Sequence, residues 1–454
     1  MARVQVTDLV VVLPGILGSR LADAEGRALW DLSGPALLRG LRGFGGSVGA
    51  LRLPKDTGDG DPGDGVVPVG LMPDLHALPG IWHPVDGYTD LLRWLERHFT
   101  LSVSDNLLTF PYDWRLSCRH GAERLKGRID LELERWRASA PERREARVVF
   151  LCHGMGGLVA RYYAERLGGH EVTRRVITLG TPHHGSLRAL ADLVDGSGGP
   201  GEPELGAFAR SLPSLHQLAP DHACVEGPGG LARVRDLPGL PGVDEALLAD
   251  AARFHADLRG APPRAELYAI SGTGQPTAVT AQWAGGRLIL VPEGDGDGTV
   301  PLPDRAGPAS GPFTGPFAGS WAAYEQHGSL QNNAAVRAAL RGLLGAEPVL
   351  PPGGEAVLLP DAGRLAAPAV RLGVRAPAVL AAGVPYEVAV TAPDDARPPL
   401  AELRPADGGR PVARPLRSLG GGRHGAVFPP PEPGAYRLSV GQVTALSLIR
   451  RSAL

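Results

Sequence analysis

Short apolar runs alternate with helical stretches over roughly the first 345 residues of the chain. Such alternation is typical of an α/β domain built on a mainly parallel sheet. The expected strands are Leu9–Leu13, Leu107–Phe110, Val148–Leu151, Val176–Leu179, Glu266–Ser271 and Leu288–Val291. The expected helices, in which apolar residues recur at helical spacing, are Tyr88–His98, Arg119–Ala138, Leu158–Arg166 and Asn332–Leu344.

From Pro348 onward the pattern changes to short alternating runs between prolines and glycines. In Val384–Val390 and Ala435–Val440 every second residue is apolar, as in a strand with one buried face. Several such runs predict a small antiparallel β-sandwich over residues 348–454, after a first domain over residues 1–345. The segment Pro433–Tyr436 resembles the entry to a late strand of an immunoglobulin-like domain, so we expect a C-terminal unit of that kind.

Composition limits the possible partners and compartment. The net charge of −2 gives no reason to expect nucleic acid as a partner. The cysteines are odd in number (Cys118, Cys152 and Cys224), which argues against a disulfide framework and favours a reducing compartment. The N-terminal apolar run Leu9–Leu13 is too short for a signal sequence or a membrane span. We therefore expect a cytoplasmic protein without a transmembrane segment.

The run Val148–Leu158 predicts a buried strand, a sharp turn and the start of a helix. The elbow G-x-S-x-G of α/β-hydrolases carries a nucleophilic serine on such a turn, and the next backbone N–H serves the oxyanion hole. The corresponding letters here are Cys-His-Gly-Met-Gly, so Gly154 occupies the nucleophile position and supplies no side chain. Cys152 lies two residues before the turn, and we expect its sulfur in the sheet–helix interface.

Five further segments follow the order of an α/β-hydrolase site. They are Leu13–Ser19, Phe110–Arg115, Leu179–Ser186, Gly296–Pro301 and Gln326–Asn332. The order of nucleophile position, acid and histidine is that of α/β-hydrolases rather than of chymotrypsin or subtilisin. Together with Leu212-Pro213-Ser214-Leu215, these motifs resemble the lecithin:cholesterol acyltransferase family, including its bacterial lipase-like members, over roughly residues 7–345.

The resemblance implies a role for each matching residue. Asp297 would be the triad acid and His327 the general base. The backbone N–H groups of Leu17 and Met155 would form the oxyanion hole, and no cofactor or metal would be needed. The resemblance also implies an α/β-hydrolase fold with a cap, or lid, over roughly residues 187–260. A lipid or acyl-ester small molecule would be the substrate.

Other polar residues fit structural roles. His183 and His184 lack a second cluster at ligand spacing, so we expect loop or helix-cap positions rather than metal ligands. The aspartates of the Gly-rich insertion Asp56–Gly65 do not follow the calcium-loop pattern and predict a solvated turn. We expect Asp113 and Arg115 to pair beneath a stacked tryptophan and to hold the loop beside the pocket.

Glycine at position 154 leaves three functional alternatives open. The chain could be a pseudo-hydrolase that binds a lipid or acyl ligand, or a scaffold with a protein partner on its C-terminal β-sandwich. A water in the serine's place could be activated by His327 and give slow hydrolysis without an acyl-enzyme. The chain could also be a variant of an active serine lipase or acyltransferase. Because serine-to-glycine is a single-base change, the sequence favours a natural substitution.

Overall fold

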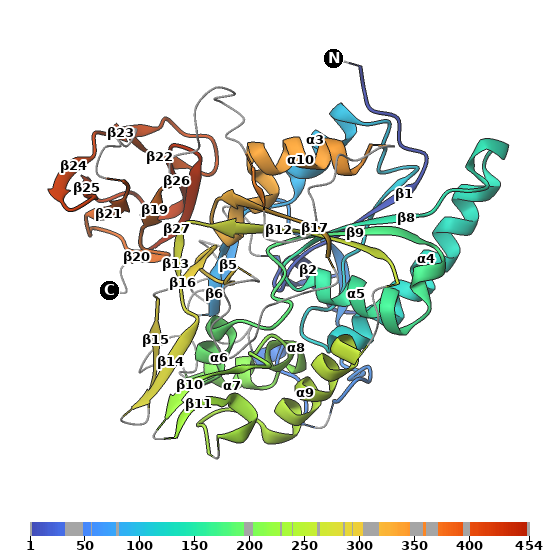
Figure 1. Cartoon of the computed structure of the whole chain (residues 1–454), viewed down its shortest axis with the longest axis horizontal. Helices are drawn as coiled ribbons and strands as arrows, with labels where there is room; N and C mark the ends of the chain where they lie inside the picture. The colour runs from blue at the N-terminus through green and yellow to red at the C-terminus, as the bar shows by residue number, and fades with distance from the viewer. Residues whose placement is uncertain are drawn as a thin grey trace.

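The structure is a computed structural model, and it describes the chain except for the following residues. These are residues 1, 32–48, 56, 79–80, 195–202, 228, 238, 261–263, 285–286, 293, 303–316, 346–356, 360–370, 394–399 and 452–454. Figure 1 shows an α/β body, which carries the N-terminus, beside a smaller β-rich unit formed by the C-terminal part of the chain.

A seven-stranded sheet, in which every neighbouring pair is parallel, forms the centre of the α/β body (Figure 1). In spatial order its strands are β18 (Val357–Leu358), β17 (Phe317–Tyr324), β12 (Glu266–Thr273), β9 (Thr173–Leu179), β8 (Val148–His153), β1 (Leu9–Leu13) and β7 (Leu107–Thr109). Both β1 and β8 are buried along their whole length. Continuous apolar runs suit such strands because helices cover both faces of a parallel sheet. The predicted α/β class is confirmed.

Helices pack on both faces of this sheet. The helices α4 (Cys118–Ala138) and α5 (Gly156–Arg166) contribute to one hydrophobic core, and α3 (Thr89–His98) and α10 (Ala334–Leu343) contribute to the other. The N-cap of α10 is Asn333, whose side chain accepts hydrogen bonds from two backbone N–H groups of the first turn. All four predicted helices are present, with ends shifted by at most two residues.

Two strands differ from the sequence-based expectation. The predicted strand Leu288–Val291 exists as β15 (Arg287–Val291), but it lies in a separate four-stranded sheet of order β11-β10-β14-β15. Strand β17 was not predicted, because its sequence Phe-Ala-Gly-Ser-Trp-Ala-Ala-Tyr has no β-branched residue. Burial between β12 and β18 compensates for this weak local preference.

The described parts of residues 187–260 form a layer of helices and short strands. Its elements are α6 (Leu187–Val194), α7 (Pro203–Arg210), α8 (Pro213–Gln217), β10 (Ala223–Gly227), β11 (Gly230–Arg233), the 3-10 helix η3 (Val234–Asp236) and α9 (Glu245–Gly260). The antiparallel pair β14 (Thr280–Ala284) and β15 extends the sheet of β10 and β11. In Figure 1 these elements lie together on one side of the central sheet.

Short elements complete the α/β body. They are β2 (Ser19–Ala22), β3 (Ala28–Trp30), β4 (Val67–Leu71), β5 (His76–Leu78), β6 (Ile81–Val85), β13 (Gln275–Thr277) and β16 (Gly294–Gly296), with the 3-10 helices η1 (Pro141–Arg143), η2 (Gly169–Glu171) and η5 (His327–Asn332). Strand β2 follows the segment after β1 and pairs with β4, and η5 begins shortly after the end of β17. The candidate site lies among these connections.

Two sheets that share one hydrophobic core make up the C-terminal unit, in the arrangement of a β-sandwich. One sheet holds β19 (Gly373–Arg375), β21 (Tyr386–Thr391), β25 (Arg423–Phe428) and β24 (Arg417–Gly420). The other holds β20 (Val379–Ala381), β27 (Val443–Arg450), β26 (Gly434–Val440), β22 (Ala401–Pro405) and β23 (Val412–Arg414). The alternation seen in the sequence is present: Tyr386, Val388 and Val390 are buried, and so are Tyr436, Leu438 and Val440.

Among the helices that the structure describes, none is both long and apolar enough to cross a membrane.

Candidate active site

The turn after β8 has the predicted form of a nucleophile elbow. Gly154 has φ +50°, a left-handed conformation that glycine adopts without a steric penalty. Its N–H donates to the carbonyl of Leu179 over 2.9 Å, and α5 begins two residues later. A Cβ on Gly157 would lie 2.1 Å from Oγ1 of Thr181, so this position requires glycine for close packing of the helix on the next loop. The local chain path therefore presents residue 154 at the top of the sheet.

Asp297 and His327 form a buried acid–histidine pair. Nδ1 of His327 lies 2.8 Å from Oδ2 of Asp297, and each residue is 2% exposed. The second carboxylate oxygen accepts hydrogen bonds from the backbone N–H groups of Thr299 (2.9 Å) and Val300 (2.6 Å). Because Nδ1 faces a carboxylate, it carries the ring proton of neutral His327, and Nε2 is the basic nitrogen.

The basic nitrogen of His327 faces the nucleophile position. A Cβ placed on Gly154 would lie 3.3 Å from Nε2 and 3.7 Å from Cε1 of His327. A hydroxyl on that Cβ would be within hydrogen-bond reach of Nε2, which is the geometry that general-base activation requires. The structure thus brings together Gly154, Asp297 and His327, three of the residues that the sequence predicted for the site.

The predicted oxyanion loop follows β1 and contains a strained residue. Leu17 has φ +64° and is the only non-glycine residue with positive φ in the described part of the chain. It lies in a turn closed by a 3.1 Å hydrogen bond from the Gly18 N–H to the Gly15 carbonyl, at the position where glycine is usual. The indole N–H of Trp30 donates to the Leu17 carbonyl over 2.8 Å and fixes the orientation of this peptide. Strain of this kind clusters at functional sites.

Among the described residues, neither predicted oxyanion donor is taken up by a protein acceptor. Within the described residues, the backbone N–H groups of Leu17 and Met155 donate to no protein atom. Both residues are 1% exposed, and Met155 is the N-cap of α5, where the first backbone N–H groups of the helix have no intrahelical partner. Such groups are suited to hold a negatively charged oxygen.

A hydrogen-bonded histidine that the sequence analysis did not single out connects the loops of the site. The Gly15 N–H donates to the Tyr88 hydroxyl (3.0 Å), which lies 3.1 Å from Nδ1 of His153. Nε2 of His153 lies 3.0 Å from the carbonyl oxygen of His327. A carbonyl only accepts, so Nε2 of His153 carries the proton and Nδ1 accepts from Tyr88. Burial, and next the neighbouring His327, lower the pKa of His153 to about 3, so this ring stays neutral.

The segment containing the elbow also matches a known family. Residues 84–202 match the family model described as lecithin:cholesterol acyltransferase. Over this segment the chain is lecithin:cholesterol acyltransferase-like. The resemblance predicted from the motifs is thereby confirmed for these residues. Among curated proteins, no sequence matches the chain.

Solved structures show a weak likeness to this chain. The propeptide form of Bacillus licheniformis lipase BlEst2 is 13% identical, with 96% of this chain and 72% of that chain covered and a TM-score of 0.34. The mature form of the same lipase is 12% identical, with coverage of 58% and 65% and a TM-score of 0.26. At these TM-scores the assignment of the fold rests on the strand order given above.

In the Pro-Tyr-Asp-Trp-Arg motif of the lecithin:cholesterol acyltransferase-like segment, the predicted pair of Asp113 and Arg115 is present, but the tryptophan packs edge to face rather than stacked. The guanidinium of Arg115 is fully buried, 2.6 Å from the Asp113 carboxylate. The neighbouring Trp114 meets Trp30 edge to face at 5.4 Å between ring centroids. Asp64 of the acidic insertion also pairs with Arg115 at 2.8 Å, so this carboxylate is not part of a merely solvated turn as predicted. Its local sequence does not reveal a partner 51 positions away.

Three other predicted residues lie outside the reactive centre. Cys152 is fully buried in the core between the sheet and the helices, as predicted, and burial raises the pKa of its thiol. His183 is also buried, and burial holds its pKa well below the ordinary value. His184 faces Asp221, with 3.1 Å between Nδ1 and the carboxylate.

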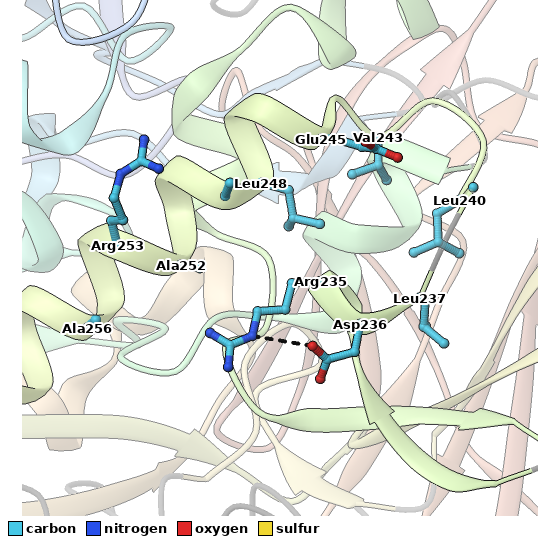
Figure 2. Close-up of a pocket in the computed structure, with 12 residues that line it drawn as sticks. Arg235, Asp236, Leu237, Leu240, Val243, Glu245, Leu248, Ala252, Arg253 and Ala256 are labelled. Carbon is cyan, nitrogen blue, oxygen red and sulfur yellow. Dashed lines mark ion pairs between the residues drawn. The ribbon is translucent and has the colours of Figure 1, made fainter.

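Two cavities differ in their relation to the dyad. A cavity of about 850 Å³ lies between α9 and the segment that follows η3, and Figure 2 shows the apolar side chains of Leu237, Leu240 and Leu248 beside it. No residue of the dyad lines it. A smaller cavity of about 250 Å³ is lined by both Asp297 and His327. Contact with the reactive groups favours the smaller cavity as the one that serves the site.

Proposed function

We propose that this lecithin:cholesterol acyltransferase-like chain is a lipase, esterase or O-acyltransferase-like protein with a serine-type acyl-transfer site from which the nucleophilic atom is missing. One observation carries the proposal: the position of a Cβ on Gly154 lies 3.3 Å from Nε2 of His327. A glycine-containing turn without a catalytic role is not expected to face the basic nitrogen of a buried acid–histidine pair. The substrate class that fits this chemistry is a lipid or other acyl ester.

In this proposal each residue has a defined chemical task. His327 acts as general base and later returns the proton as general acid. Asp297 fixes the tautomer of His327 and stabilises its protonated form. The backbone N–H groups of Leu17 and Met155 stabilise the negative charge that develops on the substrate carbonyl oxygen. These backbone groups do not depend on the side chain at position 154. No cofactor is required, because the chemistry of a catalytic triad uses only protein groups.

Glycine at position 154 makes an acyl-enzyme impossible there. We expect the chain to be inactive or weakly active, with any turnover arising from a water that His327 activates. Removal of triad members from other enzymes leaves about 10³–10⁴-fold catalysis over water, so a weak activity is compatible with the remaining groups.

A pseudo-hydrolase that binds a lipid or acyl ligand is the second candidate. The cavity of about 250 Å³ beside the dyad supports it, because a ligand could occupy the site without being cleaved. Under this alternative the chain is a pseudoenzyme.

We further propose the division of the chain that the sequence predicted. Residues 1–345 form the hydrolase domain with residues 187–260 as its cap, and residues 348–454 hold the immunoglobulin-like unit. The exception within 348–454 is β18, which pairs with β17 at the edge of the central sheet. The Tyr436 hydroxyl donates to the Glu432 carbonyl over 3.0 Å, a contact that supports the immunoglobulin-like assignment. Three free, buried cysteines support a reducing compartment.

Hydrolysis of p-nitrophenyl acyl esters by four forms of the protein tests the proposal. These forms are the native chain, His327→Ala, Gly154→Ser, and Gly154→Ser combined with His327→Ala. We expect activity with Gly154→Ser and its loss in the double variant. Native activity that disappears with His327→Ala alone would support the water route. Ester hydrolysis by none of the forms would leave binding as the function, and lipid carried through purification would then be identified by mass spectrometry.

A further inference from the structure

The C-terminal unit holds the loop that carries His327. The Thr444 N–H on β27 donates to the Glu325 carboxylate over 2.7 Å. The Gln326 side-chain amide donates to the Val374 carbonyl on β19 over 2.9 Å. Both partners of the C-terminal unit thus bond to residues one or two positions before His327.

The residue after His327 is held in the same way. Gly328 lies against Leu446 of β27, since a Cβ on Gly328 would come within 3.2 Å of Cδ1 of Leu446. On its other side the same Cβ would meet the carbonyl oxygen of Pro84 at 2.2 Å. The backbone beside the catalytic histidine is therefore clamped between the segment before α3 and the C-terminal unit.

An ion pair fixes this clamp from a second direction. Asp86 receives the guanidinium of Arg437 from β26 at 2.5 Å, and its other carboxylate oxygen accepts from the Asn332 amide at 2.8 Å. The Asp86 backbone N–H donates to the Gly328 carbonyl over 2.8 Å, and the Gln331 amide donates to the Asp86 carbonyl over 2.9 Å. Asp86 thus bonds to η5 through both backbone and side chain, and Arg437 holds Asp86.

Burial makes these contacts strong. Asp86 is 4% exposed and Glu325 1% exposed, so removing a partner leaves a charged or polar group without water to replace it. The C-terminal unit also supplies one wall of the cavity that contains Asp297 and His327, through Val374, Ala376 and Leu446.

We propose that the C-terminal unit is a working part of the active site, in which Arg437 and Leu446 act as positioning residues for His327. The inference rests on the proposed function, in which His327 is the general base. Arg437 holds the loop of His327 through Asp86, and Leu446 packs against that loop directly. It gives the C-terminal unit an intramolecular partner, the loop from Glu325 to Asn333. If the contacts of this clamp are weakened, we expect the protein to lose turnover but to keep substrate binding.

Two variants test the clamp, Arg437→Gln and Leu446→Val, with Arg404→Gln as the matched control. Arg404 lies on β22 in the same sheet and pairs with Glu402 at the exposed surface. In the Gly154→Ser background we expect each clamp variant to lower kcat about 10- to 100-fold, the range expected when reacting groups move by up to 1 Å, with KM changed little. The charge-preserving variant Arg437→Lys should recover part of the loss. The control should retain kcat.

A second measurement does not depend on turnover. We expect the proton between His327 Nδ1 and the Asp297 carboxylate to give a far-downfield proton NMR signal in the native chain. Arg437→Gln and Leu446→Val should broaden or shift this signal. If the signal and kcat are both unchanged in folded clamp variants, the proposal is wrong. If Gly154→Ser shows no activity but the signal responds, the proposed function fails and the positioning role stands. Should one variant fail to fold, the other decides.

Discussion

The ring of His153 and the backbone of His327, 174 positions apart, are joined by a hydrogen bond of 3.0 Å. On its other side His153 accepts from Tyr88, whose hydroxyl also receives the N–H of Gly15 in the oxyanion loop. One buried histidine therefore connects the two sides of the candidate site, and its neutral form fixes the direction of every hydrogen bond in the series.

Replacement of this connecting ring is expected to destabilise the fold. His153→Phe would leave the His327 carbonyl without this donor and the Tyr88 hydroxyl proton without an acceptor, at about 1–3 kcal/mol each. Tyr88→Phe would leave the Gly15 N–H without its acceptor and Nδ1 of His153 without its donor, so we expect a similar loss in the free energy of unfolding. Urea unfolding of both variants and of the double variant measures the losses. Because the two residues share one hydrogen bond, the double variant should lose less than the sum of the two, and strictly additive losses would contradict the connecting role of His153.

Any side chain at position 154 should reduce stability. Gly154 has φ +50°, so Gly154→Ala introduces backbone strain of about 1 kcal/mol and also brings a Cβ to 3.3 Å from His327. The matched control is Gly168→Ala, where φ is +80° and a Cβ would meet no atom within 4 Å. Thermal unfolding should show the larger loss for Gly154→Ala. If Gly154→Ala loses no more stability than Gly168→Ala, the His327 ring moves away from the new Cβ without lowering stability.

In the Gly154→Ser enzyme, the acid of the pair should matter far more than its neighbour. Asp297→Asn keeps the acceptor for the Thr299 and Val300 N–H groups but no longer imposes the tautomer of His327, and kcat should fall about 10⁴-fold. The control is Asp295→Asn, whose carboxylate accepts from Thr273 and Gly274 rather than from the dyad. We expect its kcat to remain within a few-fold of the parent. A similar loss for both would indicate a general effect of charge on the loop.

We expect Glu325 to dominate the pH dependence of the free energy of unfolding on the alkaline side. Burial raises the pKa of the Glu325 carboxyl from 4.5 to about 8, against the opposing hydrogen bonds from the Thr444 and Gln326 N–H groups. Between these two values the folded chain holds a proton that the unfolded chain has lost. The free energy of unfolding therefore falls as the pH rises through this window.

Buried histidines produce the opposite slope on the acid side. Burial lowers the pKa values of His76 and His255 from 6.5 to about 4, so the unfolded chain binds protons first and stability falls as the pH drops through that window. Glu325→Gln should flatten the alkaline slope and leave the acid slope in place. Urea midpoints measured between pH 4 and pH 9 test this. If the alkaline slope is unchanged in Glu325→Gln, another group causes the loss of stability at high pH.

Local chain features were readable from the sequence, since they depend on near neighbours. The apolar run of β8 and the small residues after it predicted a strand, a turn and a helix, and the structure has all three. The alternation around Tyr386 and Tyr436 likewise predicted strands with one buried face. Motif order alone identified Asp297 and His327 as candidates, and the structure brings them to 2.8 Å.

Other features depended on segments distant along the chain. Strand β17 has a weak local preference and exists because two strands enclose it. Strand β15 has the same apolar run as a central strand but pairs in another sheet, since periodicity does not specify a partner. Asp64 was expected in solvent and instead pairs with buried Arg115.

The sequence by itself determined the class of the fold, the strand, turn and helix around Gly154, and the order of Asp297 and His327 along the chain. These follow from backbone preferences and spacing, which are properties of the chain itself. Only the tertiary structure decided that His153 joins the site, that Asp86 and Arg437 meet, and that the C-terminal unit contacts the loop of His327. Such contacts depend on burial and on distances between residues far apart in sequence, and packing alone establishes both.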